Sequence, residues 1–578
     1  MVPAVIDRVG SSAGTAGERV ASDKVRSLRD AVSLVEAGDE IHVFCGHSRW
    51  TAAASELVRQ WWGRDPQFTL NMLSLSSLGT LFFRGGLVRK VVTGYSGDVF
   101  PNFTPNRIFG DAYLSGEVEV EHWSFLAFSQ RLEAAARGLP AMTTLSIAGS
   151  SMADNDGFAA VASPFGSPSG PIGLVEAHAP DVALLHAPIA DRQGNVAFHP
   201  PLLEGVWGAL AARRGAIVTV ERIVDDIRPW SHLVKIPAHR TLAVVECPLG
   251  AHPGGLYGSF TPAAPYGEDL EFWSEVRNAS RGDDFDEWIR RWVLDPADHD
   301  AYLDQLGAER VTSLRRRAEV SSWRDDEAAY PPDLDAAAND WERAAVLGAR
   351  VLADRLVAGS ADAVLAGAGV ANLATWLGVE LAQARGSEVL LTAELGLWGY
   401  EPTPADPFVF NHRAFPSSTM IADSSEVLGM IVGGPGTRTF ACLGAAQIDV
   451  LGNINSTVIP GRTFLVGSGG GNDVASAADE VVVVTTLTAR RTCEQVPYVT
   501  SPGTRVSRLV TDHGVFAKGD DGRFELVALA DGVEVADVAA VCGWELVVAD
   551  DLGRLDPVTM DEVAVLRRWD PRGFFLRG

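Results

Sequence analysis

Short apolar runs of strand length alternate along this chain with longer amphipathic stretches, and this alternation limits the fold more than any other feature. The runs expected to be strands are 41–45, 182–186, 217–220, 241–247, 363–366, 389–392, 439–443 and 481–485. Helical periodicity occurs in the stretches 48–62, 126–138 and 370–385. Buried strands that alternate with helices predict an α/β fold with a mainly parallel sheet.

The length of 578 residues exceeds what one hydrophobic core normally fills, so two or more domains are expected. After residue 256 the alternation gives way to helical spacing in a segment rich in Trp, Asp, Glu and Arg. A polar, proline-containing stretch over 321–340 ends that segment. We therefore predict an α/β domain over 1–256, a helical appendage and linker over 257–335, and a second α/β domain over 336–578.

A short motif occurs once in each of the two α/β parts. Asp191-Arg192-Gln193-Gly194-Asn195 follows a candidate strand in the first part, and Asp449-Val450-Leu451-Gly452-Asn453 follows one in the second. Asp, Gly and Asn are also common turn residues, so an unrelated pair of turns is the competing interpretation. The shared position directly after a strand favours two related domains.

Charge and cysteine usage argue against several classes of function. A net charge of −26 does not provide the broad cationic face that nucleic acid requires, so we expect no nucleic-acid partner. The five cysteines are scattered and lack CxxC spacing, which argues against a disulfide framework or a structural zinc site. HExxH and EF-hand patterns are also missing from the sequence, so no metal site is predicted. No apolar run suits a signal peptide or membrane span, so we expect a cytoplasmic protein without a membrane partner.

Glu394 follows one of the expected strands of the second part, in the segment Thr392-Ala393-Glu394-Leu395-Gly396-Leu397-Trp398. Ligands bind at the carboxyl ends of strands in open α/β sheets. A carboxylate among bulky apolar residues at such a place would be partly desolvated and available as a nucleophile or base. A helix-capping or ion-paired glutamate is the structural alternative.

Two segments rich in small residues could bind an anion. Consecutive glycines at 469–471 open a helical stretch, and their N–H groups suit a pyrophosphate or a developing oxyanion. The Gly-Lys-Ser/Thr ending of a Walker A loop is missing, so ATP hydrolysis is not indicated. The second segment, Gly444-Ala445-Ala446, would let a ligand lie against the backbone, although tight packing explains small residues equally well.

The segment Gly367-Ala368-Gly369-Val370-Ala371-Asn372 lies between an expected strand and an expected helix, as the opening of a dinucleotide-binding fingerprint would. In that interpretation Glu394, at the end of the next strand, would bind the ribose. Asn372 stands where the fingerprint has its third glycine, which weakens this alternative. A tight strand-to-helix turn also accounts for the two glycines.

Taken together, these segments resemble the family I CoA-transferases, especially the glutaconate CoA-transferase branch. The segments that carry the resemblance are TAELGLWG at 392–399, LGAAQIDVLGN at 443–453, PGRTFLVGSGGGNDVAS at 460–476 and ECPLGAHPGGLYG at 246–258. This family usually has separate α and β subunits with related folds. The resemblance therefore implies an α-like part fused to a β-like part in one chain, and pairing of two such chains as a homodimer.

The resemblance also assigns a reaction. It implies an acyl-CoA:carboxylate CoA-transferase in which Glu394 attacks the thioester and then carries CoA as a glutamyl-CoA thioester in a ping-pong cycle. The partners would be an acyl-CoA and a carboxylic acid, and coenzyme A would be substrate and product, with no further cofactor. The residues expected to line the CoA and oxyanion region are Gly444, Ala445, Gly469, Gly470, Gly471, Asn472 and Asp473.

The α-like part departs from the family pattern in two places. The early turn around Arg49 is poorer in glycine than usual, and Glu121-His122-Trp123-Ser124 replaces a Gln-Gly seen in many transferases. The second segment resembles the branch of ring-opening CoA-ester hydrolases, whose working glutamate lies in the α part. Arg49, Glu121 and Ser124 are therefore candidate substrate-binding or acid residues. The alternative function is a CoA-ester hydrolase that uses Glu121, with C–C bond cleavage as one form of that reaction.

Overall fold

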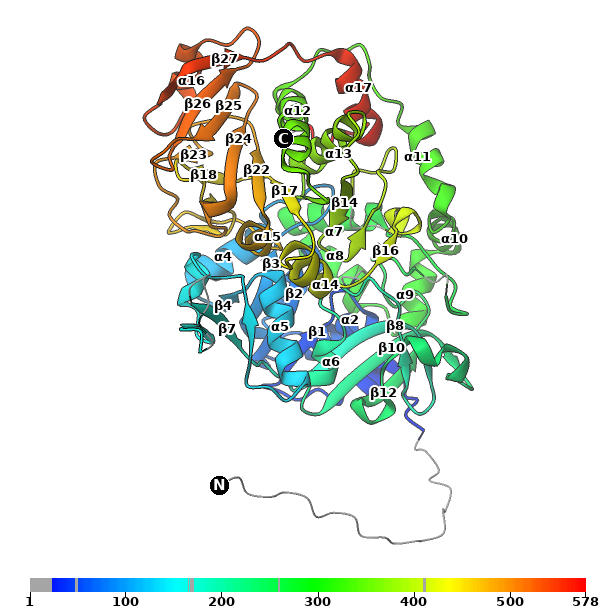
Figure 1. Ribbon diagram of the computed structural model, residues 1–578. Coiled ribbons are helices and arrows are strands. Elements are labelled where there is room, and N and C mark those ends of the chain that lie inside the picture. Colours follow the sequence, from blue (N-terminus) through cyan, green and yellow to red (C-terminus); the bar gives the residue numbers. More distant parts are fainter. Residues whose placement is uncertain are drawn as a thin grey trace.

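The computed structural model describes residues 23–46, 50–164, 166, 171–257, 260–408 and 412–577. Figure 1 shows two lobes, one formed by the first half of the chain and the other by the second half. Each lobe is built around one large, mainly parallel sheet with helices beside it. The predicted α/β fold is confirmed.

The first sheet has nine strands over the described residues, and its parallel part runs in the order β12-β10-β8-β1-β2-β3-β4. These strands are β1 (Glu40–Val43), β2 (Phe68–Leu75), β3 (Val88–Ser96), β4 (Glu119–His122), β8 (Val182–Asp191), β10 (Gly215–Val224) and β12 (Thr241–Glu246). All ten residues of β8 are buried, as an unbroken apolar run at the centre of a covered sheet predicts. The helices of this lobe include α1 (Leu28–Val32), α2 (Ala52–Trp61), α4 (Arg107–Ser115), α5 (Phe125–Ala136) and α6 (Trp207–Ala211).

The second sheet has ten strands over the described residues, with the parallel order β14-β13-β17-β22-β24 followed by β25, β26 and β27. These strands are β13 (Ala363–Ala366), β14 (Leu390–Ala393), β17 (Thr439–Leu443), β22 (Glu480–Val484), β24 (Val506–Val510), β25 (Gly514–Lys518), β26 (Phe524–Leu529) and β27 (Val548–Arg554). The helices include α12 (Asp340–Gly359), α13 (Val370–Gln383), α15 (Gly471–Ala477), α16 (Val535–Val541) and α17 (Met560–Trp569).

The two sheets repeat one topology. The order β2-β1-β8-β10-β12 in the first matches β14-β13-β17-β22-β24 in the second. The repeated Asp-x-x-Gly-Asn turns also agree, because Asn195 N–H donates to Asp191 Oδ1 and Asn453 N–H donates to Asp449 Oδ1, both over 2.9 Å. Shared strand order and shared turn geometry confirm the prediction of two related domains.

The segment between the lobes is helical. It contains α7 (Leu270–Arg281), α8 (Phe285–Ile289), α9 (His299–Leu306), α10 (Ala308–Arg317) and α11 (Trp323–Ala329). Arg281 anchors α7 to the first lobe through a 2.6 Å ion pair with Asp98, while Asp326 in α11 pairs with Arg413 of the second lobe over 2.7 Å. Figure 1 shows α9, α10 and α11 following one side of the molecule from one lobe to the other. No helix in the described ranges is long and apolar enough to cross a membrane.

Candidate active site

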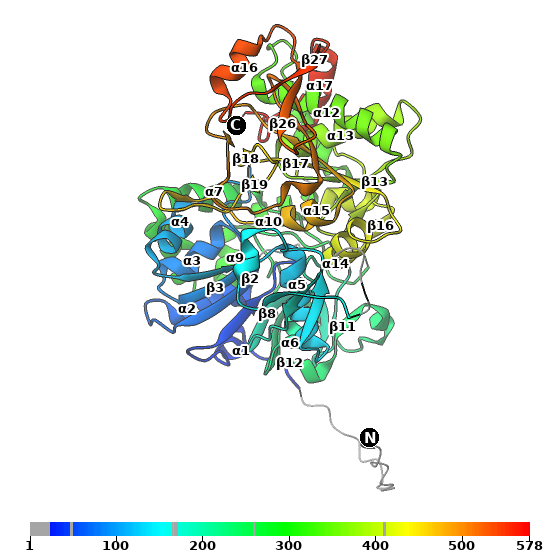
Figure 2. The same cartoon turned by 60° about the vertical axis from the view of Figure 1, so that its left-hand side comes forward.

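A cavity of about 430 Å³ lies between the two lobes, where the carboxyl ends of parallel strands from both sheets meet. Figure 2 shows the lobes from a second direction, with α14 (Ser424–Glu426) and α15 at their boundary. The lining residues that end or follow these strands are Cys45, Gly46, Ser74, Tyr95, Gly367, Ala368, Gly369, Glu394, Gly444, Ala445, Ala446 and Thr485. Ligand sites in open α/β proteins lie at this edge of the sheet, so the position predicts a binding site.

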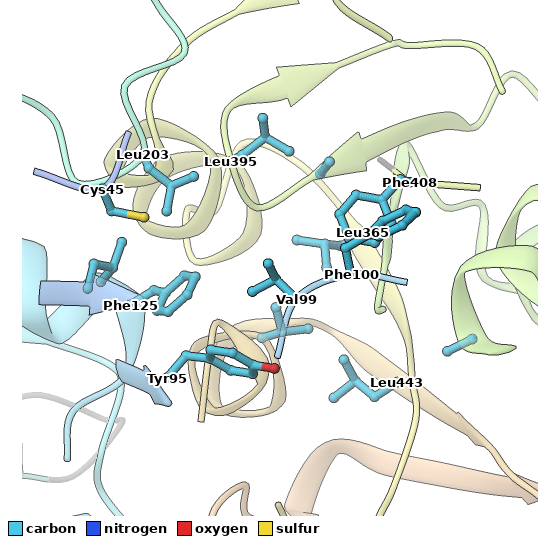
Figure 3. Packing of buried hydrophobic residues seen from close by; sticks show 14 of the residues in the cluster. Cys45, Tyr95, Val99, Phe100, Phe125, Leu203, Leu365, Leu395, Phe408 and Leu443 are labelled. Atoms are coloured by element: carbon cyan, nitrogen blue, oxygen red, sulfur yellow. The ribbon is translucent and has the colours of Figure 1, made fainter. Parts of the chain in front are cut away.

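Most of the cavity wall is apolar. Figure 3 shows Cys45, Phe125 and Leu203 of the first lobe around the same space as Leu395 and Leu443 of the second. A small number of polar groups in an apolar, concave wall is typical of sites for organic ligands.

The glycine-rich segment before α15 is bonded to the first lobe through its backbone. The N–H of Ser96 donates to the carbonyl of Val466 over 2.7 Å, and the N–H of Gly469 donates to the carbonyl of Gly94 over 3.0 Å. The carbonyl of Gly469 in turn accepts the N–H of Phe125 over 3.1 Å. These bonds fix the glycine backbone that faces the cavity.

Glu394 lies in the cavity wall directly after β14. Its carbonyl accepts a 2.5 Å hydrogen bond from the hydroxyl of Ser424. Gly396 must be glycine because its φ is +125° and an added Cβ would lie 1.9 Å from the carbonyl oxygen of Ala422. The Glu-x-Gly motif therefore combines an acidic group with the only residue type that permits the turn behind it.

The carboxyl of Glu394 is less acidic than an ordinary glutamate. Burial and the nearby negative charge of Asp473 raise the pKa of Glu394 from 4.5 to about 7, and a backbone hydrogen bond from Gly470 partly offsets them. A pKa near 7 is typical of a carboxyl group whose surroundings suit it for acid, base or nucleophilic chemistry.

Gly470 lies directly against this carboxyl. A Cβ at position 470 would be 2.0 Å from Glu394 Oε2 and 3.0 Å from Cδ. The backbone of Gly470 has φ −82°, which any residue adopts, so the requirement for glycine here comes from the close approach alone.

The structure brings six of the predicted residues together at the cavity wall: Glu394, Gly444, Ala445, Gly469, Gly470 and Gly471. Asn472 and Asp473 are buried behind that wall and do not line it. Asn472 Oδ1 accepts the N–H of Ile147 over 2.8 Å, and Asp473 accepts the hydroxyl of Ser146 over 2.6 Å and the N–H of Leu126 over 3.1 Å. Both side chains therefore join the lobes, and Asp473 acts on Glu394 only through its charge.

Glu121 and Ser124, the predicted residues of the α-like part that the structure describes, do not line the cavity. Glu121 in β4 forms ion pairs with Arg131 over 2.7 Å and Lys90 over 2.9 Å, and does not line the cavity. Burial alone would raise its pKa, but these two cations hold the pKa of Glu121 below its ordinary value. Ser124 is buried and caps α5 by accepting the N–H of Ala127 over 3.3 Å. Arg49 lies outside the described residues. Glu121 is therefore a structural ion-pair partner, which removes the geometric support for the hydrolase alternative.

Several lining residues were not predicted. Arg491, Trp341 and the pair Phe574–Phe575 face the cavity, although they come from the loop after β22, the start of α12 and the C-terminal segment. The tandem Arg490-Arg491 after an expected strand, in so acidic a chain, was the one available signal. The loop Gly367–Gly369 also lines the cavity, so the segment for which dinucleotide binding was the alternative interpretation opens into the same space as Glu394.

Comparison with known proteins identifies the family. Residues 25–246 match the family model described as coenzyme A transferase. Over these residues the chain belongs to the coenzyme A transferase family. As a CoA-transferase family member it is a transferase, and it carries both subunit-like parts in one polypeptide. Within the described ranges, no group of three or more His, Cys, Asp or Glu residues could hold a metal ion.

Three relatives have names that describe them as subunits of CoA-transferases. One subunit of glutaconate CoA-transferase from Acidaminococcus fermentans is 29% identical over 320 residues, which cover 50% of this chain and 94% of the relative. Two different subunits of 3-oxoadipate CoA-transferase from Pseudomonas knackmussii are 29% and 25% identical, covering 48% and 32% of this chain and 97% and 78% of their own lengths.

The fold of the whole chain also occurs in a solved single-chain structure. The apoenzyme of the acyl-CoA transferase YdiF from Escherichia coli O157:H7 superposes with a TM-score of 0.62 at 17% identity. The match covers 92% of this chain and 95% of that one. At this identity the likeness concerns the fold.

Proposed function

We propose that this CoA-transferase moves CoA from an acyl-CoA to a carboxylic acid, with Glu394 as the nucleophile. The observation that carries the proposal is the position of its carboxyl group, in the wall of an apolar cavity and against the backbone of Gly470. The reaction balances with acyl-CoA, carboxylic acid and CoA alone, so it calls for no metal or redox cofactor.

In the first step, the Glu394 carboxylate attacks the thioester carbonyl of the acyl-CoA. The tetrahedral oxyanion collapses, CoA leaves as the thiolate, and an acyl–glutamyl anhydride remains on the enzyme. A thiol has a pKa near 8.5, so the leaving group needs little help from an acid. Backbone groups of Gly444 and Ala445, and the N-terminus of α13 at Val370, line the cavity and are the candidate partners of this oxyanion.

In the second step, the CoA thiolate attacks the glutamyl carbonyl and releases the first carboxylate, leaving CoA bound to Glu394 as a thioester. The negative charge now develops on an oxygen of Glu394 itself. The N–H of Gly470 already bonds that carboxyl group, so it is placed to stabilise this second oxyanion. The incoming acid then reverses both steps, which gives ping-pong kinetics.

The apolar wall has a role in this scheme. A glutamyl thioester hydrolyses if water reaches it, and transfer then becomes wasteful hydrolysis. Phe125, Leu203 and Leu395 line the cavity together with Glu394 and present no polar side-chain group to hold a water molecule. We infer that their packing protects the intermediate.

Kinetics of Glu394 variants test the proposal. Glu394→Gln keeps the shape of the side chain but removes the nucleophile, so CoA exchange between an acyl-CoA and a free acid should fall to background. Glu394→Asp withdraws the carboxyl by one methylene and should lose most of the activity for positional reasons. Exchange that persists in both variants would refute the proposed nucleophile.

The same assay separates transfer from hydrolysis. Beyond the one equivalent that forms the enzyme–CoA thioester, consumption of acyl-CoA by the native enzyme should require an acceptor acid, whereas a CoA-ester hydrolase would release free CoA continuously without one. We further propose that two chains pair as a homodimer, as the resemblance suggests. Sedimentation velocity at micromolar concentration should show the dimer, and a monomer would contradict it.

A further inference from the structure

One cation faces the cavity in the part of the chain that the structure describes. Arg491, in the loop after β22, is the sole Lys, Arg or His among the described lining residues, and Glu394 is the sole acid. The chain carries 74 Asp and Glu residues against 48 Lys and Arg. In so acidic a protein, a cation that faces a cavity is a candidate binding site for a negatively charged group of the ligand.

The guanidinium of Arg491 is held in place without a carboxylate. Its central carbon lies 4.9 Å from the centre of the Trp341 ring, and its Nη1 donates to the carbonyl of Ala445 over 3.1 Å. Its Nε and Nη2 groups donate to no acceptor among the described residues. Burial and the neighbouring Arg490 lower the pKa of Arg491, and no carboxylate counteracts them. Arg491 is half-buried, and charged groups that lose part of their hydration are normally paired, so these two N–H groups are available to an anionic ligand.

The strand order sets the distance between Arg491 and the reacting carboxyl. Glu394 follows β14. Arg491 itself follows β22, and its side chain contacts Ala445 in the loop after β17. Two to three strand spacings separate these positions, which amounts to about 10–14 Å along the carboxyl edge of the sheet. The cavity is continuous between them, because Gly367–Gly369 after β13 and Gly444–Ala446 after β17 line it as well.

This distance matches the reach of coenzyme A. The chain from the sulfur of CoA to its first phosphorus is as long as about four residues of extended backbone, or about 14 Å. A CoA whose sulfur lies at the Glu394 carboxyl, extended along the sheet edge, would therefore bring its pyrophosphate to Arg491. A planar guanidinium with two free donors binds phosphate oxygens in a bidentate manner.

We propose that Arg491, oriented by Trp341 and Ala445, binds the phosphate groups of CoA and thereby sets the direction in which the substrate lies in the cavity. This assignment rests on the proposed function, because it takes the sulfur to react at Glu394. It also explains how a chain with a net charge of −26 accommodates a polyanionic substrate: one local cation and nearby backbone N–H groups oppose the overall repulsion.

A truncated substrate tests the assignment. Pantetheine and acyl-pantetheine carry the same thiol and acyl group as CoA and acyl-CoA but lack the phosphates. Arg491→Ala should raise KM for acyl-CoA by about 10- to 100-fold, which is the usual effect of losing one hydrogen bond to a charged group. The same variant should leave KM for acyl-pantetheine within about 2-fold of the native KM. Arg491→Lys keeps the charge without the fork and should recover part of the affinity.

Arg385→Ala is the matched control. Arg385 is exposed at the far end of α13, where it pairs with Asp354, and its removal should change neither KM. Equal losses for acyl-CoA and acyl-pantetheine in Arg491→Ala would show that the side chain only supports the Ala445 loop. No loss for either substrate would show that the phosphates lie elsewhere. Either result overturns the proposal.

Calorimetric binding keeps this test independent of turnover. CoA and pantetheine are titrated into Glu394→Gln and into the double variant with Arg491→Ala, neither of which needs to react. Weaker binding of CoA alone in the double variant would support the phosphate site even if Glu394 proved not to be the nucleophile. Unchanged CoA binding would refute the site even if Glu394 formed the expected thioester.

Discussion

The close approach of Gly470 to Glu394 gives the most specific prediction. Gly470→Ala adds one methyl group to a backbone whose φ of −82° tolerates it, so the chain should fold normally. That methyl would lie 2.0 Å from Glu394 Oε2, whereas ordinary contacts between heavy atoms are about 3.5 Å or longer. The carboxyl must therefore move by more than about 1 Å, and the Gly470 N–H can no longer reach it in the same geometry.

Both consequences lower the rate. A misplacement of about 1 Å costs on the order of 100-fold in a reaction that depends on alignment. Loss of one oxyanion donor costs about 100- to 1,000-fold. The two effects act on the same carboxyl and are not additive, so we expect kcat/KM for CoA exchange to fall by about 100- to 1,000-fold, or roughly 3–4 kcal/mol of transition-state stabilisation.

Steady-state exchange and thermal unfolding should be measured together. Gly110→Ala is the control, because an added Cβ in the middle of α4 would come no closer than 4.0 Å to Phe464 and should alter neither property by much. Exchange by Gly470→Ala within about 3-fold of the native rate would refute the reasoning. A large loss of folding in Gly470→Ala with native activity per folded molecule would refute it as well.

Three further predictions concern charge. The pKa of Glu394 is about 7 in the folded chain and 4.5 in the unfolded chain, so the folded state loses stability as the pH rises through that range. Glu394→Gln cannot ionise and should therefore gain up to about 3 kcal/mol of unfolding free energy at pH 8 and nothing at pH 4. Urea denaturation at the two pH values measures this difference. Asp473→Asn removes the neighbouring charge, so the pKa of Glu394 should fall and the acidic limb of the kcat/KM profile, which needs the carboxylate, should move to lower pH. Glu121→Gln should lose about 1–3 kcal/mol of stability with its ion pairs to Arg131 and Lys90, yet retain exchange; a specific loss of turnover would contradict its structural assignment.

The sequence predicted the fold well because parallel strands buried on both faces are unbroken apolar runs. The strands at 363–366 and 439–443 were located to the residue, and the one at 389–392 lies one position later, at Leu390–Ala393. The helix expected over 48–62 spans Ala52–Trp61, because the hydroxyl of Thr51 caps its first turn. Strand order was not predictable, since it depends on pairing between residues that are far apart in the chain.

Some residues of the candidate site could be predicted from the sequence and others could not, for the same reason. Glu394 and the glycines could be recognised because each is required by its immediate surroundings, such as the turn at Gly396. The partners of Glu121 could not, because Lys90 and Arg131 reach it from a neighbouring strand and from α5. The bonds of Asp473 to the first lobe likewise join residues more than 300 positions apart. Local motifs identify which residues are unusual, whereas tertiary contacts decide what they do.

The central claim is that Glu394 becomes covalently linked to CoA. The enzyme should be incubated with a panel of acyl-CoAs without acceptor acid, quenched, digested and analysed by mass spectrometry. We predict a CoA-sized adduct on the peptide that contains Glu394, absent from Glu394→Gln and removed by hydroxylamine. An enzyme that exchanges CoA rapidly while this peptide stays unmodified, or that carries the adduct on another residue, would contradict the claim.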